Sequence, residues 1–161
     1  MIKDISASIQ FIGVDDEELD LFESQYDVPE GMSYNSYVIR DEKIAVLDTA
    51  DARKADEWKA NLADALGDSQ PDYLVVHHME PDHSALIAWM LETYPSVTLV
   101  ATAAALKMLP QFFEGIALEG RTLAVKEGDT LALGIHSLRF FLAPMVHWPE
   151  VMVSYENSEK V

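Results

Sequence analysis

Four side chains that can bind metal ions lie close together in the chain: His78, Glu80, Asp82 and His83. Pro81 stands among them and restricts the backbone that presents them. Burying several ionisable groups at one place is costly unless the groups pair with one another or bind a cation. We therefore interpret this segment as a two-metal site. His78 and Glu80 would face one ion, and Asp82 and His83 would face its neighbour.

Each of these residues also has a structural interpretation. A single His or Asp is more often a surface residue, and Asp82 could cap a helix that begins near Ser84. His77 precedes the motif and points to the opposite face of its strand by alternation, so we expect a structural role for it. Taken alone, His136 is expected at the surface rather than in a site.

A third candidate imidazole is His147, which lies between two prolines after an expected strand. Such a histidine is more often a loop residue than a ligand, but a position after a strand end is also where binding residues are found. Asp48 follows another expected strand. It is a candidate for hydrogen-bonding support of the metal-binding histidines, or alternatively a cap before Ala52.

The elements that must hold these residues follow an α/β pattern. Apolar residues at helical spacing predict helices, and alternating or continuous apolar runs predict strands. Gly67 stands where the first helix should end. Mixed strands and helices of this kind predict one layered α/β domain over residues 1–161. The expected strands are 5–11, 34–40, 43–48, 73–76, 97–101, 122–125, 130–133, 136–142 and 151–155; the expected helices are 52–66, 84–94 and 103–113.

Composition excludes several classes of function. Lys and Arg number 11 against 28 Asp and Glu, so the formal net charge is −17, and neither nucleic acid nor an anionic membrane is expected as a partner. The chain has no cysteine, so a metal must be held by His, Asp and Glu. The sequence shows neither an apolar run that could span a bilayer nor the apolar core of a signal peptide, and we expect a cytoplasmic protein.

The motif His78-x-Glu80-x-Asp82-His83, followed by His147-Trp148-Pro149, resembles the metal-binding pattern of flavodiiron proteins. The resemblance extends to residues 13–16, 21–23, 33–39, 48–49 and 80–84. It implies a metallo-β-lactamase-like αββα sandwich. It also implies that His78, Glu80 and His147 ligate one iron, that Asp82 and His83 ligate the other, and that Trp148 lines the substrate cavity.

The implied activity is reduction of dioxygen to water or of nitric oxide to nitrous oxide. The substrate would be a small gas molecule, and the electron donor a flavin domain or rubredoxin on another chain. Glu80 replaces a histidine of the hydrolase version of the motif, and an added carboxylate suits iron better than zinc. The alternatives are a dinuclear metallo-hydrolase, in which metal-bound water attacks an ester or amide, and a non-catalytic module.

The flavodiiron pattern continues beyond these motifs with a bridging aspartate, a further histidine and a flavodoxin-like domain that binds FMN. None of these is found in residues 1–161. Residues 156–159 are expected to form a turn and residues 160–161 to begin a further strand, so that the fold holds the first sheet layer and only part of the second. From this we expect partial iron occupancy, no FMN bound by this chain, and a self-associating homo-oligomer.

Overall fold

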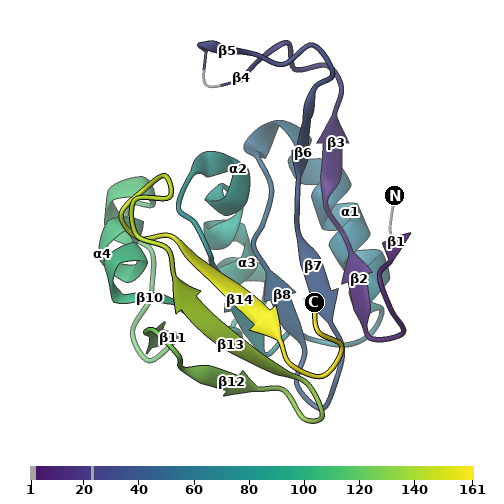
Figure 1. The fold of residues 1–161 in the computed structure, drawn as a ribbon, viewed down its shortest axis with the longest axis vertical. Helices are drawn as coiled ribbons and strands as arrows, with labels where there is room; N and C mark the ends of the chain where they lie inside the picture. Colours follow the sequence, from purple (N-terminus) through teal and green to yellow (C-terminus); the bar gives the residue numbers. More distant parts are fainter. Residues whose placement is uncertain (1–2, 23) are drawn as a thin grey trace.

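The computed structural model describes residues 3–22 and 24–161 and shows helices packed on one face of a large sheet and a small sheet packed on the other (Figure 1). Residues 1, 2 and 23 lie outside the described residues, and with them the start of the chain and Glu23 of the segment 21–23. The layered α/β architecture expected from the sequence is therefore present.

The large sheet has seven strands in the order β1-β2-β7-β8-β9-β10-β11. The pairs β1–β2, β2–β7 and β7–β8 are antiparallel, whereas β8, β9, β10 and β11 run parallel to one another. Parallel strands have their carboxyl ends at one edge, which is where open α/β sheets place their ligands. The strands are β1 (Lys3–Asp4), β2 (Ile9–Phe11), β7 (Tyr37–Ile39), β8 (Ala45–Leu47), β9 (Tyr73–Val75), β10 (Thr98–Thr102) and β11 (Thr122–Val125).

The small sheet is an antiparallel unit in the order β12-β13-β14. Two short strand pairs, β3 with β6 and β4 with β5, lie outside both sheets, and the β4–β5 pair projects from the body of the molecule (Figure 1). The strands are β12 (Thr130–Ala132), β13 (Ser137–Leu142), β14 (Met152–Glu156), β3 (Val14–Asp16), β6 (Met32–Tyr34), β4 (Leu21–Phe22) and β5 (Tyr26–Asp27).

The helices are the 3₁₀ turn η1 (Ala52–Lys54) and the α-helices α1 (Ala55–Leu66), α2 (Pro81–Ser84), α3 (Ile87–Thr93) and α4 (Ala103–Phe112). Gly67 follows α1 with a positive φ of 55°, as the predicted helix end requires. The prediction of a single helix over 84–94 is wrong at its start. The chain forms the short helix α2 first, and α3 begins only after it. No helix in the described part of the chain is long and apolar enough to cross a membrane.

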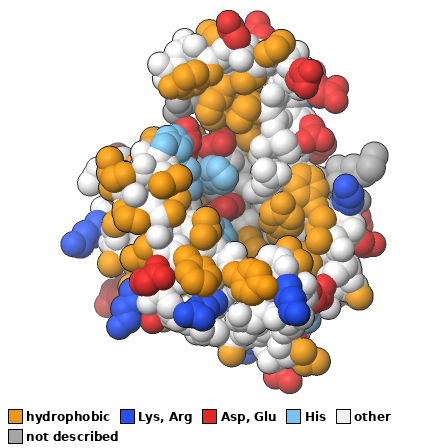
Figure 2. All heavy atoms as spheres, viewed as in Figure 1, with side chains coloured by type: hydrophobic (Ala, Val, Ile, Leu, Met, Phe, Trp, Pro, Cys, Tyr) orange, Lys and Arg blue, Asp and Glu red, His pale blue; other side chains and the backbone are white. Residues whose placement is uncertain are grey.

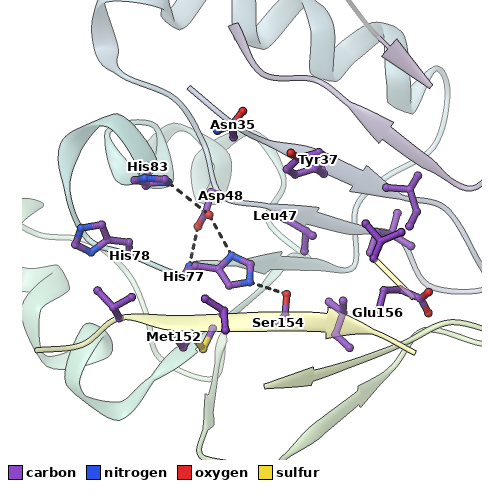
Figure 3. Close-up of a pocket in the computed structure, with 16 residues that line it drawn as sticks. Asn35, Tyr37, Leu47, Asp48, His77, His78, His83, Met152, Ser154 and Glu156 are labelled. Carbon is purple, nitrogen blue, oxygen red and sulfur yellow. Dashed lines mark hydrogen bonds and ion pairs between the residues drawn. The ribbon is translucent and has the colours of Figure 1, made fainter. Parts of the chain in front are cut away.

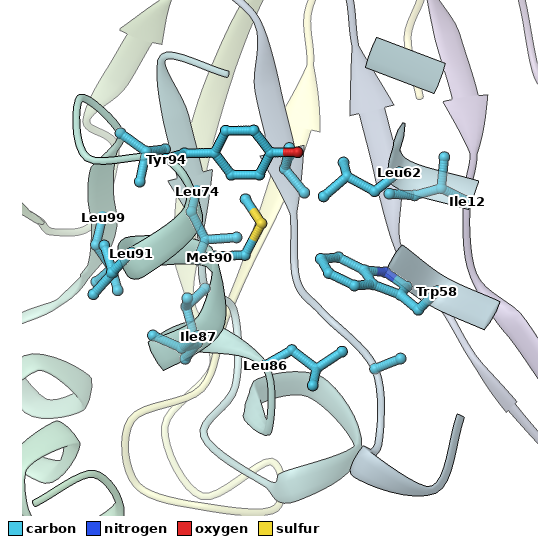
Figure 4. Packing of buried hydrophobic residues seen from close by; sticks show 14 of the residues in the cluster. Ile12, Trp58, Leu62, Leu74, Leu86, Ile87, Met90, Leu91, Tyr94 and Leu99 are labelled. Atoms are coloured by element: carbon cyan, nitrogen blue, oxygen red, sulfur yellow. The ribbon is translucent and has the colours of Figure 1, made fainter. Parts of the chain in front are cut away.

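Strand alternation divides the apolar side chains between two cores. Val38 and Leu74 face the helices and join the cluster around Trp58, which includes Met90 and is shown in Figure 4. Residues next to them in the strands, such as Ile39, face the small sheet instead. The large sheet is thus covered on both faces, which explains why β9 and the middle of β10, Leu99 to Ala101, are continuous apolar runs.

Two expectations about the small sheet are wrong. His136 is 7% exposed rather than on the surface, because its ring nitrogens lie 2.8 Å from Asp41 Oδ2 and 3.0 Å from Glu159 Oε1. Residues 160–161 do not begin a strand, because the chain forms a turn over residues 157–160 and residue 161 is irregular. The buried Glu156 carboxylate accepts hydrogen bonds from the backbone N–H groups of Ser158 and Glu159, which closes the chain into that turn.

Candidate metal centre

The predicted metal-binding segment leaves the carboxyl end of β9 and turns at once into α2. Pro81 occupies the first turn of α2, where its missing N–H costs nothing. The backbone N–H groups of His83 and Ser84 both donate to the Glu80 carbonyl, at 2.9 and 3.0 Å. The segment is therefore a tight, hydrogen-bonded turn. Asp82 lies inside α2, so the interpretation of Asp82 as a helix cap is wrong.

Three of the five predicted ligands converge. His78 Nε2 lies 3.0 Å from Glu80 Oε2, His147 Nε2 lies 2.9 Å from the same oxygen, and the two Nε2 atoms are 3.3 Å apart. One donor atom from each residue falls within 4.8 Å of the other two. Two imidazoles and a carboxylate at this separation suit a single metal ion.

Asp82 and His83 form a separate pair beside these three residues. His83 Nε2 lies 3.6 Å from Asp82 Oδ2, and the His83 ring centroid lies 5.5 Å from that of His78. Asp82 is buried, and its Oδ1 atom has no hydrogen-bond partner among the described residues. This division corresponds to the two ions assigned from the sequence, although the ligand set itself remains a prediction.

Asp48 holds the histidines at the end of β9 in place. Its carboxylate accepts a 2.7 Å hydrogen bond from the His77 backbone N–H and lies 3.1 Å from His77 Nδ1 (Figure 3). Asp48 Oδ2 also lies 3.6 Å from His83 Nδ1. The alternative role of Asp48 as a helix cap is wrong, because Asp51 accepts the Arg53 N–H at the start of η1. His77 has the structural role expected of it, since Nε2 lies 2.8 Å from Ser154 Oγ.

The charges around Asp82 and His83 favour a bound cation. Burial alone would raise the pKa of the Asp48 carboxyl, but the adjacent His77 and His83 hold its pKa below the ordinary value. Burial would lower the pKa of His83, whereas Asp48, with Asp82 and Glu80, raises it to about 9. Burial raises the pKa of Asp82. Several carboxylates thus converge on a small buried volume, which a bound cation would neutralise.

Glu150 is a functional candidate that the sequence did not reveal. It is 1% exposed, and its Oε1 atom lies 2.7 Å from His78 Nδ1 and accepts a 2.9 Å hydrogen bond from the Met79 backbone N–H. The only signal in the sequence was its position three residues after His147, since its partners lie far earlier in the chain.

Trp148 is half-buried and packs edge-on against His78, with ring centroids 5.1 Å apart. A separate hollow of about 340 Å³ opens beside Glu80 and Asp82. Trp148 is not among the residues that line this hollow. Its other walls come from the motif, from the segment around β4, from the end of β6 and from the start of η1: Leu19, Leu21, Phe22, Ser24, Tyr34, Asp51, Arg53 and Pro81. Figure 2 shows histidine and acidic side chains together below the projecting lobe.

A second cavity, of about 430 Å³, lies between the two sheets (Figure 3). Its walls are mostly apolar and include Tyr37, Leu47 and Val151, while Asp48 and His77 approach it from the metal-binding edge. His78 and His83 also line it, so the cavity adjoins both parts of the predicted metal centre.

The residues present suit a divalent metal such as iron. Three imidazoles and two carboxylates are available, the chain has no thiolate, and the carboxylate Oδ1 of Asp82 is buried without a protein partner in the described part. Oxygen and imidazole donors suit iron, while thiolate would select softer metals. An unsatisfied buried carboxylate oxygen is costly, and a metal ligand bond removes that cost.

Residues 32–161 match the family model described as ODP family beta lactamase. The chain is 32% identical to the flavo-diiron protein FprA2 of Clostridium acetobutylicum, over 98% of this chain and 39% of that protein. It is also 32% identical to the anaerobic nitric oxide reductase flavorubredoxin of Vibrio vulnificus, over 98% of this chain and 32% of that protein.

Among solved structures, rubredoxin oxygen:oxidoreductase from Desulfovibrio gigas superposes with a TM-score of 0.89 at 28% identity. The match covers 96% of this chain and 38% of that one. The predicted α/β fold class is thereby confirmed. The chain spans between 24% and 39% of the length of curated relatives that it matches.

Proposed function

Because this chain belongs to the flavodiiron proteins, within their beta-lactamase-like domain, we propose that it is the metal-binding part of a di-iron oxidoreductase. The proposed reaction is reduction of dioxygen to water or of nitric oxide to nitrous oxide. The observation that carries the proposal is the convergence of His78, Glu80 and His147 next to the Asp82–His83 pair. Two ions in adjacent positions suit a reaction that needs several electrons.

In this proposal His78, Glu80 and His147 hold one iron, and Asp82 and His83 hold the other. Bound iron would supply the redox chemistry. The ligands differ in exposure, because the His147 side chain is 64% exposed whereas those of His78 and Glu80 are 9% and 6% exposed. His78 and Glu80 therefore form the buried side of the centre, and His147 closes it from a loop.

The surroundings of the centre suit a small, weakly polar substrate. The hollow beside Glu80 and Asp82 has an apolar wall from Leu21 and Phe22, while Asp51 and Arg53 line another part of it. Dioxygen and nitric oxide need little hydrogen bonding, so in this proposal they approach along the apolar wall. Trp148, stacked edge-on against His78, excludes water from one side of the imidazole in this proposal.

The same family relationship suggests the partners. We expect electrons from a flavin or a rubredoxin, because relatives are named flavorubredoxin and rubredoxin oxygen:oxidoreductase. A homo-oligomer is the proposed assembly. Exposed apolar side chains at Met145, Val146 and Val153 offer contact surface beside the centre. A cytoplasmic location accords with this role.

The experiment is to load the full chain with ferrous iron without oxygen, measure bound iron, and follow consumption of dioxygen and nitric oxide with a chemical reductant. We expect up to two irons per chain and gas consumption that requires iron. Glu80→Ala and His83→Ala should each lower the bound iron. Lys43→Ala, an exposed residue away from the centre, serves as the control.

Two results would contradict the proposal. One is absence of metal binding under every loading condition. The other is preferential zinc binding with iron-independent hydrolysis of esters, which would favour the dinuclear hydrolase instead.

A further inference from the structure

The carboxylate of Glu150 binds two consecutive residues of the metal-binding segment with one oxygen. Oε1 lies 2.7 Å from His78 Nδ1 and 2.9 Å from the Met79 backbone nitrogen. A carboxylate accepts and does not donate, so this contact places the proton of the imidazole on Nδ1. The other ring nitrogen, Nε2, lies 3.0 Å from the Glu80 carboxylate and 3.3 Å from His147 Nε2, and a metal ion held between these groups would take the place of a proton on Nε2.

Glu150 is itself held from the opposite side. Its carbonyl oxygen accepts a 3.1 Å hydrogen bond from Thr102 Oγ1, and Thr102 in turn accepts the Ala105 N–H at the start of α4. Thr102 ends β10, the strand next to β9. The glutamate therefore connects the loop that carries His147, the end of β10 and the segment that carries His78.

We propose that Glu150 is a positioning residue that orients His78 and fixes the tautomer that presents Nε2 to the metal. This inference rests on the proposed metal centre. In this role Glu150 does not itself bind the metal ion. It acts on the ion only through the His78 ring.

Charge explains why a carboxylate stands at this position. Glu150 is 1% exposed, and its Oε2 atom has no hydrogen-bond partner in the part of the chain that the structure describes. A buried negative charge with an unsatisfied oxygen is costly, and a cation bound to the far side of the imidazole compensates it. The carboxylate in return makes the imidazole a stronger ligand.

The test compares two isosteric substitutions in the full chain, Glu150→Gln and Glu156→Gln. Glu156 is the matched control because it is a 2% exposed carboxylate that also accepts backbone N–H groups, but it contacts no proposed ligand. The readouts are the dissociation constant for ferrous or cobaltous ion and the urea midpoint of the metal-free protein.

We expect Glu150→Gln to weaken metal binding about 10- to 100-fold, the usual effect of losing such a hydrogen-bonded carboxylate. The urea midpoint of the metal-free Glu150→Gln protein should stay the same or rise, because a buried charge is removed. Glu156→Gln should give the opposite pattern, with a lower midpoint and unchanged metal affinity. Equal metal affinity of Glu150→Gln and the unmutated chain would overturn the inference while leaving the proposed centre intact.

A second measurement does not depend on any variant. Nitrogen-15 NMR of the zinc-loaded chain should show His78 protonated at Nδ1 and bound through Nε2. Metal coordination through Nδ1 would overturn the inference. If the unmutated chain binds no metal at all, the proposed function fails and the inference fails with it.

Discussion

His147 Nε2 lies 2.9 Å from Glu80 Oε2, although the His147 side chain is 64% exposed and that of Glu80 only 6%. The contact joins a loop between β13 and β14 to the turn that follows β9. An exposed side chain contributes little to folding, so its removal should separate metal binding from stability.

His147→Ala should therefore weaken binding of the first metal ion at least about tenfold. The free energy of unfolding of the metal-free chain should change by no more than about 0.5 kcal/mol. Isothermal titration and urea denaturation measure the two quantities. His136→Ala is the matched control, since His136 is buried between Asp41 and Glu159 and should lose stability without losing metal affinity. Unchanged metal binding in His147→Ala would remove His147 from the ligand set.

Asp48→Asn should affect the second ion more than the first. The Asp48 carboxylate lies near His83 Nδ1 and accepts the His77 N–H, and among the described residues it forms no hydrogen bond or ion pair with His78. Asp48 has a φ of 54°, and asparagine tolerates that backbone conformation, so the substitution tests the carboxylate rather than the turn.

We expect the second ion to bind Asp48→Asn about 10- to 100-fold more weakly, measured by metal titration monitored in two phases. The control is Asp72→Asn, because Asp72 pairs with Lys43 at a partly exposed position away from the centre. Equal weakening of both binding phases in Asp48→Asn would show that Asp48 does not act through His83.

The cluster of His136, Asp41 and Glu159 should make stability depend on pH. Burial opposes the charge of His136, but Glu159 and Asp41 raise its pKa above the ordinary value. The stabilisation of the folded chain by protonated His136 is therefore complete below about pH 6.5. It is lost as the pH rises through the raised pKa of His136. The Asp41 pKa is lowered to about 2, chiefly by the His136 backbone N–H. The Asp41 contribution is present above about pH 4 and lost as the pH falls toward 2.

The measurement is urea denaturation of the unmutated chain and of His136→Gln between pH 5 and pH 9. The difference in the free energy of unfolding between the two proteins should shrink as the pH rises. Only the unmutated chain has an imidazolium at position 136 that pairs with Asp41 and Glu159, and this pairing is lost when the imidazolium loses its proton. Using the difference removes the effect of His83, whose raised pKa acts in the same direction. A difference that stays constant with pH would mean that His136 is neutral in the folded protein.

Phe140→Ala tests how firmly the small sheet is joined to the large one. Phe140 lies on β13, is fully buried, and packs in the cluster between the two sheets. We expect a loss of about 3 to 5 kcal/mol in the free energy of unfolding. Val153→Ala, at a 52% exposed position on β14, should change it by no more than about 0.5 kcal/mol. A small loss for Phe140→Ala would indicate that the small sheet packs only loosely.

Local sequence patterns were enough to predict the metal-binding motif and most of the helices and strands. The motif from His78 to His83 was evident because its donors are close in the chain, and Pro81 and Gly67 marked a helix start and a helix end. The expected strand and helix ranges match most observed elements within a few residues. Periodicity and turn residues are short-range properties, so a sequence displays them directly.

The tertiary structure decided which distant groups meet. Glu150 contacts His78, and Asp41 contacts His136, across long stretches of chain, and nothing in the local pattern around either acid indicates its partner. For Asp48 the sequence left two roles open, support of the histidines or a helix cap, and the parallel pairing of β8 with β9 decides between them by bringing His77 to its carboxylate. Whether a carboxylate caps a helix, closes a turn or orients a ligand depends on which buried donor lies within hydrogen-bonding distance. Only the packing of the strands and loops determines that distance.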